Sequence, residues 1–103
     1  MSPYSGPEMK GHEIMALLEG DIPTVSREWL RFRESSAFPK GAPLVNQVRA
    51  FFSPMAAFLK KRHESRMPVP NEILLLVILK GIERTGTHTK SQLESALGKK
   101  LPD

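Results

Sequence analysis

The sequence contains no cysteine, and this absence excludes several classes of site. Without cysteine the chain can form no disulfide, no thiolate metal site and no cysteine nucleophile, and it fits a reducing compartment. Long apolar runs are also missing, since the longest covers residues 73–79, whereas a membrane-spanning helix needs about 20 residues. The opening residues, MSPYSGPEMKGHE, lack the basic start and apolar stretch of a secretory signal. We therefore expect a cytoplasmic protein that does not cross a membrane.

Side chains that carry catalysis or bind metals are sparse. The three histidines are His12, His63 and His88, and none has a second histidine four residues away, as a zinc-binding helix requires. A glycine-rich phosphate loop and a nucleophile elbow are also absent. We therefore expect that the protein is not an enzyme and that it has no catalytic residues, no metal ligands and no cofactor.

The length of 103 residues allows one domain of ordinary size and is too short for two. Apolar residues make up 40% of the chain and charged residues 25%, which is the balance of a globular protein rather than of a disordered one. We expect a single domain over residues 1–103, with a flexible N-terminus at residues 1–6.

Charge is distributed unevenly along the chain. Residues 27–66 carry nine basic groups and three acidic ones, within an overall net charge of +4. A cationic segment of this kind is typical of a surface that meets phosphate or an acidic protein. A solvated face of mixed charge would give a similar count, so the pattern alone leaves both interpretations open.

Capping residues and hydrophobic periodicity predict an all-α fold of about five helices. The expected helices cover residues 7–20, residues 24–35 with Thr24 as the cap, residues 43–63, residues 72–84, and residues 89–98 with a capping box at Thr89. Pro54 lies inside the third helix and predicts either a kink or a new helix capped by Ser53. The fourth helix is apolar on more than one face, so we expect it to be the most buried element.

Residues 13–40 combine a helix, a glycine-containing turn and a second helix that displays arginines, which is the layout of a helix-turn-helix. Three apolar residues recur at helical spacing and would hold the second helix to the core: Val25, Trp29 and Phe32. Arg27 and Arg31 would then face outward, where arginine suits contacts with guanine or phosphate. An ordinary helical hairpin with a solvated Arg/Glu face would show the same pattern.

Two stretches carry a family resemblance, VSREWLRFRESSAFPK at residues 25–40 and VRAFFSPMAAFLKKR at residues 48–62. Over residues 12–62 the chain resembles the small winged-helix DNA-binding regulators of phages and mobile elements, the excisionase and Alp-type proteins. The first stretch is similar to their recognition helix, and the second to their strand-then-helix ending. The resemblance implies a bacterial or phage protein without catalytic residues that bends or marks DNA. It also implies a minimal wing between residues 40 and 52, although the periodicity of residues 44–52 favours a helix.

The leading hypothesis is a small DNA-binding transcriptional regulator that binds double-stranded DNA through a helix-turn-helix within residues 12–66. Six residues form the predicted DNA-binding set: Arg27 and Arg31 toward the groove, and Arg33, Lys60, Lys61 and Arg62 on the phosphate backbone. The run at residues 60–62 has a second interpretation, because cations are also favoured at a helix C-terminus.

The alternative hypothesis is a helical adaptor or anti-activator that binds and inhibits a transcription regulator or an enzyme. Its signature would be an exposed apolar patch around Leu44, Val48, Phe51 and Phe52. Residues 70–98 are expected to form a C-terminal helical pair that supplies core and a dimerisation surface. Because one short chain offers little surface to cover the run at residues 73–79, we also expect a homodimer.

Overall fold

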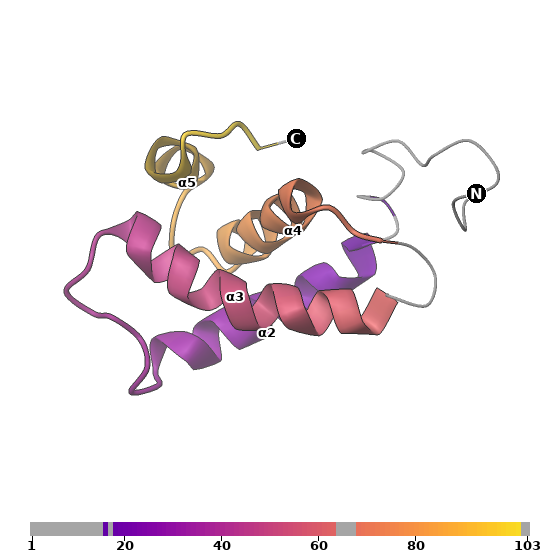
Figure 1. Cartoon of the computed structure of the whole chain (residues 1–103). Coiled ribbons are helices and arrows are strands. Elements are labelled where there is room, and N and C mark those ends of the chain that lie inside the picture. Colours follow the sequence, from indigo (N-terminus) through magenta and orange to yellow (C-terminus); the bar gives the residue numbers. More distant parts are fainter. Residues whose placement is uncertain (1–15, 17, 64–67, 102–103) are drawn as a thin grey trace, which may run out of the picture.

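The computed structural model of the chain describes residues 16, 18–63 and 68–101 (Figure 1). This described part is all-helical and contains no strand, which confirms the predicted fold class for it. Its elements are the 3-10 turn η1 (Glu19–Asp21) and the helices α2 (Ile22–Arg33), α3 (Leu44–His63), α4 (Asn71–Arg84) and α5 (Lys90–Leu97). Residues 1–6 and nearly all of the helix expected at residues 7–20 lie outside the described residues, so the count of about five helices is not confirmed.

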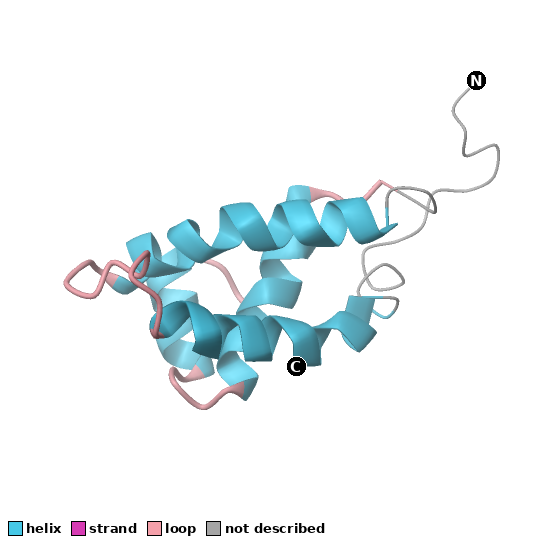
Figure 2. Ribbon diagram, turned by 90° about the horizontal axis from the view of Figure 1, so that it is seen from below, coloured by secondary structure: helices cyan, strands magenta, loops and turns pink. Residues whose placement is uncertain are grey.

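Helices α2 and α3 lie side by side and run in opposite directions, because the loop at residues 34–43 reverses the chain (Figure 1). Accordingly Asp21, at the start of α2, contacts Arg62 and His63 at the end of α3. Helix α4 packs against both, and α5 packs against α3 and α4. Figure 2 shows the same helices from below, with the connecting loops at their ends.

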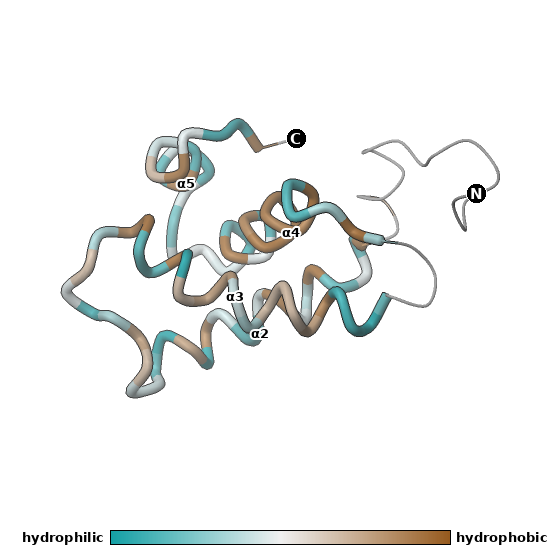
Figure 3. The backbone as a smooth tube through the Cα atoms, viewed as in Figure 1, coloured by the Kyte–Doolittle hydropathy of each residue, from teal (hydrophilic) through white to brown (hydrophobic). Residues whose placement is uncertain are grey.

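Helix α4 is the centre of the core, as its composition predicts. Figure 3 shows an apolar middle of α4 with hydrophilic residues toward both of its ends, whereas polar and apolar positions alternate along α2 and α3. Five of its side chains are fully enclosed: Leu74, Val77, Ile78, Leu79 and Ile82. Burying one such side chain contributes about 1.5–3 kcal/mol. A single chain therefore encloses these five residues, while Ile73, Leu75 and Leu76 of the same run are partly buried, and the homodimer stays a prediction.

Trp29 of α2 anchors an aromatic cluster beside α4. Its ring is fully buried, and the ring centroid of Phe51 lies 5.2 Å away in an edge-on arrangement. Phe32 and Phe38 complete the cluster, with centroids 6.3 Å and 6.0 Å from that of Trp29. Edge-to-face aromatic pairs add about 0.5–1.5 kcal/mol beyond the burial of their area. The cluster fixes the loop at residues 34–43 against the helices that it joins.

Helix α2 begins earlier than the sequence predicts. Thr24 was the expected cap, but the helix starts at Ile22 and has Pro23 in its first turn, where the missing N–H is tolerated. The turn η1 leads directly into it, and the Asp21 side chain makes no capping bond there. The Asp21 carboxylate instead contacts α3. Residues 13–15 and 17 lie outside the described residues, so the helix-turn-helix stays a prediction.

Helix α3 continues through Pro54 without a new start at Ser53. Pro54 cannot donate a hydrogen bond to the carbonyl of Ala50, but both residues are exposed, so that carbonyl can face water. Between residues 40 and 52 the chain forms the end of a loop and the first turns of α3. The minimal wing implied by the resemblance is therefore not confirmed, whereas the helix favoured by the periodicity is present.

The caps of α5 agree with the prediction. The backbone N–H of Gln92 donates to the Thr89 hydroxyl at 3.1 Å, and the Gln92 side chain accepts from the backbone N–H of Thr89 at 2.8 Å. At the other end Gly98 takes φ of +67°, a left-handed conformation that favours glycine. Local sequence therefore determines both ends of this helix.

Candidate interaction site

The outward orientation of two arginines on α2 is confirmed. Val25 and Trp29 are fully buried, while Arg27 and Arg31 are exposed. Leu30 lies on the same outer side and is 46% exposed. The helix therefore presents a basic surface with one large apolar residue, and its opposite face is held in the core.

The other predicted DNA-binding residues do not all share this surface. Arg33 lies on the side of α2 that faces the α4–α5 loop, where burial and the charge of Arg33 lower the pKa of His88 below the ordinary 6.5 of histidine. Lys61 follows Phe58 by three residues near the end of α3 and is exposed. Lys60 is turned by about 100° from Lys61 around the helix, away from α2. The six residues are all exposed, but they do not form one face.

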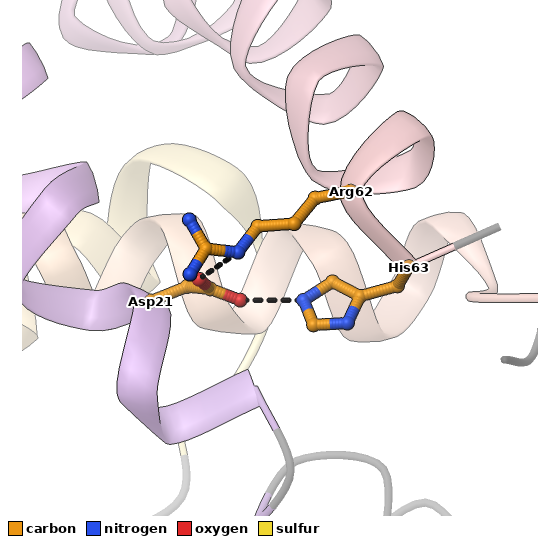
Figure 4. Close-up of polar contacts among 3 residues, drawn as sticks. All are labelled: Asp21, Arg62 and His63. Carbon is orange, nitrogen blue, oxygen red and sulfur yellow. Dashed lines mark hydrogen bonds and ion pairs between the residues drawn. The ribbon is translucent and has the colours of Figure 1, made fainter. Parts of the chain in front are cut away.

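A buried polar cluster joins the start of α2 to the end of α3 (Figure 4). Nε2 of His63 lies 2.6 Å from Oδ2 of Asp21, and Nε of Arg62 lies 3.2 Å from Oδ1. Asp21 is 3% exposed and His63 is 8% exposed. A buried carboxylate needs such partners, because its desolvation costs several kcal/mol. Arg62 is thus engaged with Asp21 rather than available as a separate phosphate contact.

Sequence analysis did not find this cluster. In the sequence Asp21 lies three residues before Thr24 and His63 directly follows the basic run at residues 60–62, and neither position suggests that the two meet. Their separation of 42 residues leaves no periodic pattern that could have linked them. The available signal was weak: an acidic residue directly before one helix, and a basic end on an adjacent antiparallel helix.

A groove of about 530 Å³ runs between α2 and α3. It is lined by Thr24, Glu28, Arg31 and Phe32 from α2, by Ser35 from the following loop, and by Phe51, Pro54, Met55 and Phe58 from α3. Most of the α2 wall is polar, and the α3 wall is apolar. Phe58 is 46% exposed, although a side chain of this size usually lies deeper in a protein. This α2–α3 groove combines an apolar floor with an exposed aromatic residue at its edge.

Charged groups lie in and beside the α2–α3 groove. Glu28 and Arg31 form an ion pair of 3.6 Å, in which the Arg31 side chain is 77% exposed and the Glu28 side chain 37%. Arg27 lies one turn before Arg31 on the outer edge of α2. Lys61 lies one turn beyond Phe58 on α3. Arg31 therefore lines the groove, and Arg27 and Lys61 are exposed cations one turn away from lining residues.

The adaptor hypothesis predicted an exposed apolar patch on α3, and this prediction is wrong. Val48 is fully buried and Phe51 is 4% exposed, because they belong to the stripe that packs α3 on the core. Leu44 and Phe52 are partly buried. Among the described residues the large apolar side chains that are exposed are Leu30 and Phe58. Periodicity identified an apolar stripe on α3 but could not separate its core side from its outer side.

Metal-ligand clusters and membrane-spanning helices are absent from the described residues. They contain no group of three or more histidine, cysteine, aspartate or glutamate side chains close enough to hold a metal ion. Their buried side-chain nitrogen and oxygen atoms all have hydrogen-bond partners. None of the helices in this part of the chain is long and apolar enough to cross a membrane. His12 lies outside the described residues.

Comparison with known protein families, with curated proteins and with solved structures finds no match for this chain. The resemblance to winged-helix regulators therefore stays an expectation. The α2–α3 groove and the charges around it are the features of the structure that bear on function.

Proposed function

We propose that this protein is a non-catalytic interaction domain that binds an amphipathic helix of a partner protein in the α2–α3 groove. The observation that carries the proposal is the apolar groove of about 530 Å³ with the half-exposed Phe58 at its edge. A large aromatic side chain beside a concave apolar surface is typical of the residues that dominate binding energy at protein interfaces. The partner would be a transcription regulator or an enzyme, the two kinds of protein that the adaptor hypothesis names.

The shape and chemistry of the groove favour a helix as the occupant. Along α2 the lining extends from Thr24 to Phe32, and Ser35 of the following loop continues it; the helical part is about 12 Å long, or two turns. An amphipathic helix places side chains at i, i+3, i+4 and i+7 into such a groove. The exposed cations in and beside the groove complement a partner with acidic side chains.

The test starts from a displayed library of amphipathic helical peptides selected on the full chain. Affinity of a selected peptide is measured by fluorescence anisotropy for wild type, Phe58→Ala and Leu30→Ala. Phe58 and Leu30 are both 46% exposed, so Leu30→Ala is a matched control outside the groove. Truncating an aromatic anchor costs about 2 kcal/mol, or roughly 30-fold in Kd. The proposal predicts this loss for Phe58→Ala and less than a twofold change for Leu30→Ala, and equal losses would contradict it.

A second candidate function is DNA binding, the leading hypothesis from the sequence. Arg27 and Arg31 support it, because they are exposed one turn apart on α2 and their helix is anchored in the core. The basic sequence, with a pI of about 9.7, is consistent with attraction to phosphate. Selection from a random duplex pool, followed by anisotropy across a salt series, tests it.

Variants separate the two candidate functions. DNA binding predicts that Arg27→Ala and Arg31→Ala weaken the affinity for a selected duplex, while Phe58→Ala leaves that affinity unchanged. Groove binding predicts a Phe58-dependent peptide affinity and no enrichment of a DNA motif. Intact duplex affinity in both arginine variants would exclude the DNA-binding role.

A further inference from the structure

We infer that the α2–α3 groove selects partner helices whose apolar stripe is bordered by acidic side chains, and that Glu28 limits its affinity for them. The inference rests on the proposed function and specifies the chemistry of the partner. It also assigns a role to the single acidic residue among those described as lining the groove.

Three cations at the groove edges are placed to contact an acidic partner. Arg31 lines the α2 side, Arg27 lies one turn before it, and Lys61 lies one turn beyond Phe58 on α3; all three are exposed. Arg62 is left out of this set because its guanidinium pairs with the buried Asp21 at 3.2 Å, whereas Glu28, the partner of Arg31, is 37% exposed and can be replaced. A helix lying in the groove would carry its apolar residues on the floor and its flanking residues beside these cations. Glutamate or aspartate at the flanking positions would be attracted, and lysine or arginine would be repelled.

Glu28 opposes this attraction in two ways. Its carboxylate lies 3.6 Å from the Arg31 guanidinium and compensates part of that charge. Glu28 is also the less exposed partner and faces the groove, so an incoming carboxylate meets its negative charge. A partner carboxylate must therefore replace Glu28 at Arg31 and approach a like charge. Glu28 therefore lowers the affinity for partners in general. It favours partners with enough acidic side chains to replace it at Arg31.

Removing the charge of Glu28 should then strengthen binding of an acidic helix, which is an unusual direction for a substitution in a binding site. Glu28→Gln keeps the size of the side chain and leaves Arg31 free to pair with the partner. Arg31→Gln removes the attracting charge and should have the opposite effect. Exposed charge pairs contribute modestly, so each change should alter Kd about two- to fivefold.

The experiment uses three synthetic helices with one shared apolar stripe, taken from the selected peptide, and flanking positions that are all Glu, all Gln or all Lys. Anisotropy gives Kd for wild type, Glu28→Gln, Arg31→Gln and Phe58→Ala at low and high salt. We expect affinity to fall in the order Glu, Gln, Lys peptide, and to depend on salt for the first and last. Glu28→Gln should tighten the Glu peptide about two- to fivefold and leave the Gln peptide within error.

The outcomes separate this inference from the proposed function. Equal affinity for the three peptides, with a loss in Phe58→Ala, would overturn the charge selectivity and leave the groove as a binding site. Unchanged or weaker binding of the Glu peptide by Glu28→Gln would overturn the role of Glu28. Absence of Phe58-dependent binding for every peptide would instead contradict the proposed function. Thermal unfolding of each variant establishes that it is folded.

Discussion

Asp21 looks in the sequence like an ordinary polar residue before a helix, but in the fold its carboxylate is buried. A carboxylate that is 3% exposed is paired with two basic side chains from a helix 41 and 42 residues later. Periodicity and capping rules describe neighbours along one helix, so they could place Arg27 and Arg31 outward but could not pair Asp21 with His63. For the same reason these rules could not predict the α2–α3 groove, which is formed where two helices pack together.

Removing the Asp21 carboxylate should destabilise the fold. Asp21→Ala leaves the buried His63 ring without its hydrogen-bond partner, and breaking a buried charged pair costs about 2 kcal/mol or more. Arg62 limits the loss, since its side chain is 55% exposed and can return to water. Urea unfolding followed by circular dichroism measures the change. Glu19→Ala is the control because Glu19 is an exposed acid two residues earlier; identical midpoints for the two variants would contradict the account of the cluster.

His88 should make stability depend on pH. Burial of the ring and the charge of Arg33 lower the pKa of His88 below 6.5 in the folded protein. The folded state therefore favours neutral His88, and this contribution is fully present above the unfolded pKa of about 6.5. It is lost as pH falls through the lowered pKa. The Tm of wild type should fall more steeply than that of His88→Gln between about pH 7 and pH 5, and parallel curves would show that His88 contributes nothing.

Among the elements, α4 and α5 were predicted well because their determinants are local. Thr89, Gln92 and Gly98 are close in sequence, and the apolar run of α4 needs no partner to identify it. The start of α2 and the continuity of α3 were predicted less well. The first depends on the contacts of Asp21 with α3, and the second on whether the carbonyl opposite Pro54 can reach water.

The packing of α2 on α4 depends on Gly81. A Cβ atom added there would collide with the Val25 side chain, and the Ser26 hydroxyl donates to the Gly81 carbonyl at 2.6 Å. Alanine is better than glycine in a helix by about 1 kcal/mol, but overpacking costs about 1–3 kcal/mol, and the β-branched Val25 has few alternative rotamers.

Gly81→Ala should therefore lower the free energy of unfolding, as measured by guanidinium denaturation. Gly41→Ala provides the control, because Gly41 lies in a loop with nothing within 4 Å of the added atom and no positive φ. A Gly81→Ala protein as stable as the Gly41→Ala protein would mean that the two helices can separate without loss.

At the scale of the molecule, the described hydrophobic core is closed. The outer side of α2 and α3 is the surface whose exposed apolar and charged side chains the core does not account for. The described core residues enclose one another within a single chain. The α2–α3 groove, by contrast, keeps Phe58 46% exposed beside Arg27, Arg31 and Lys61. Charge counting from the sequence located the cationic segment correctly. It could not show that two of its arginines border an apolar groove, because that arrangement requires α2 and α3 to be packed together.

The measurement that would decide whether this groove is a binding site is an NMR titration of the ¹⁵N-labelled chain with the selected peptide. The account predicts amide shifts concentrated on α2 around Thr24, Glu28 and Arg31 and on α3 from Pro54 to Phe58, with α5 unaffected. Shifts spread over α4 and α5, or shifts that persist unchanged in Phe58→Ala, would contradict it.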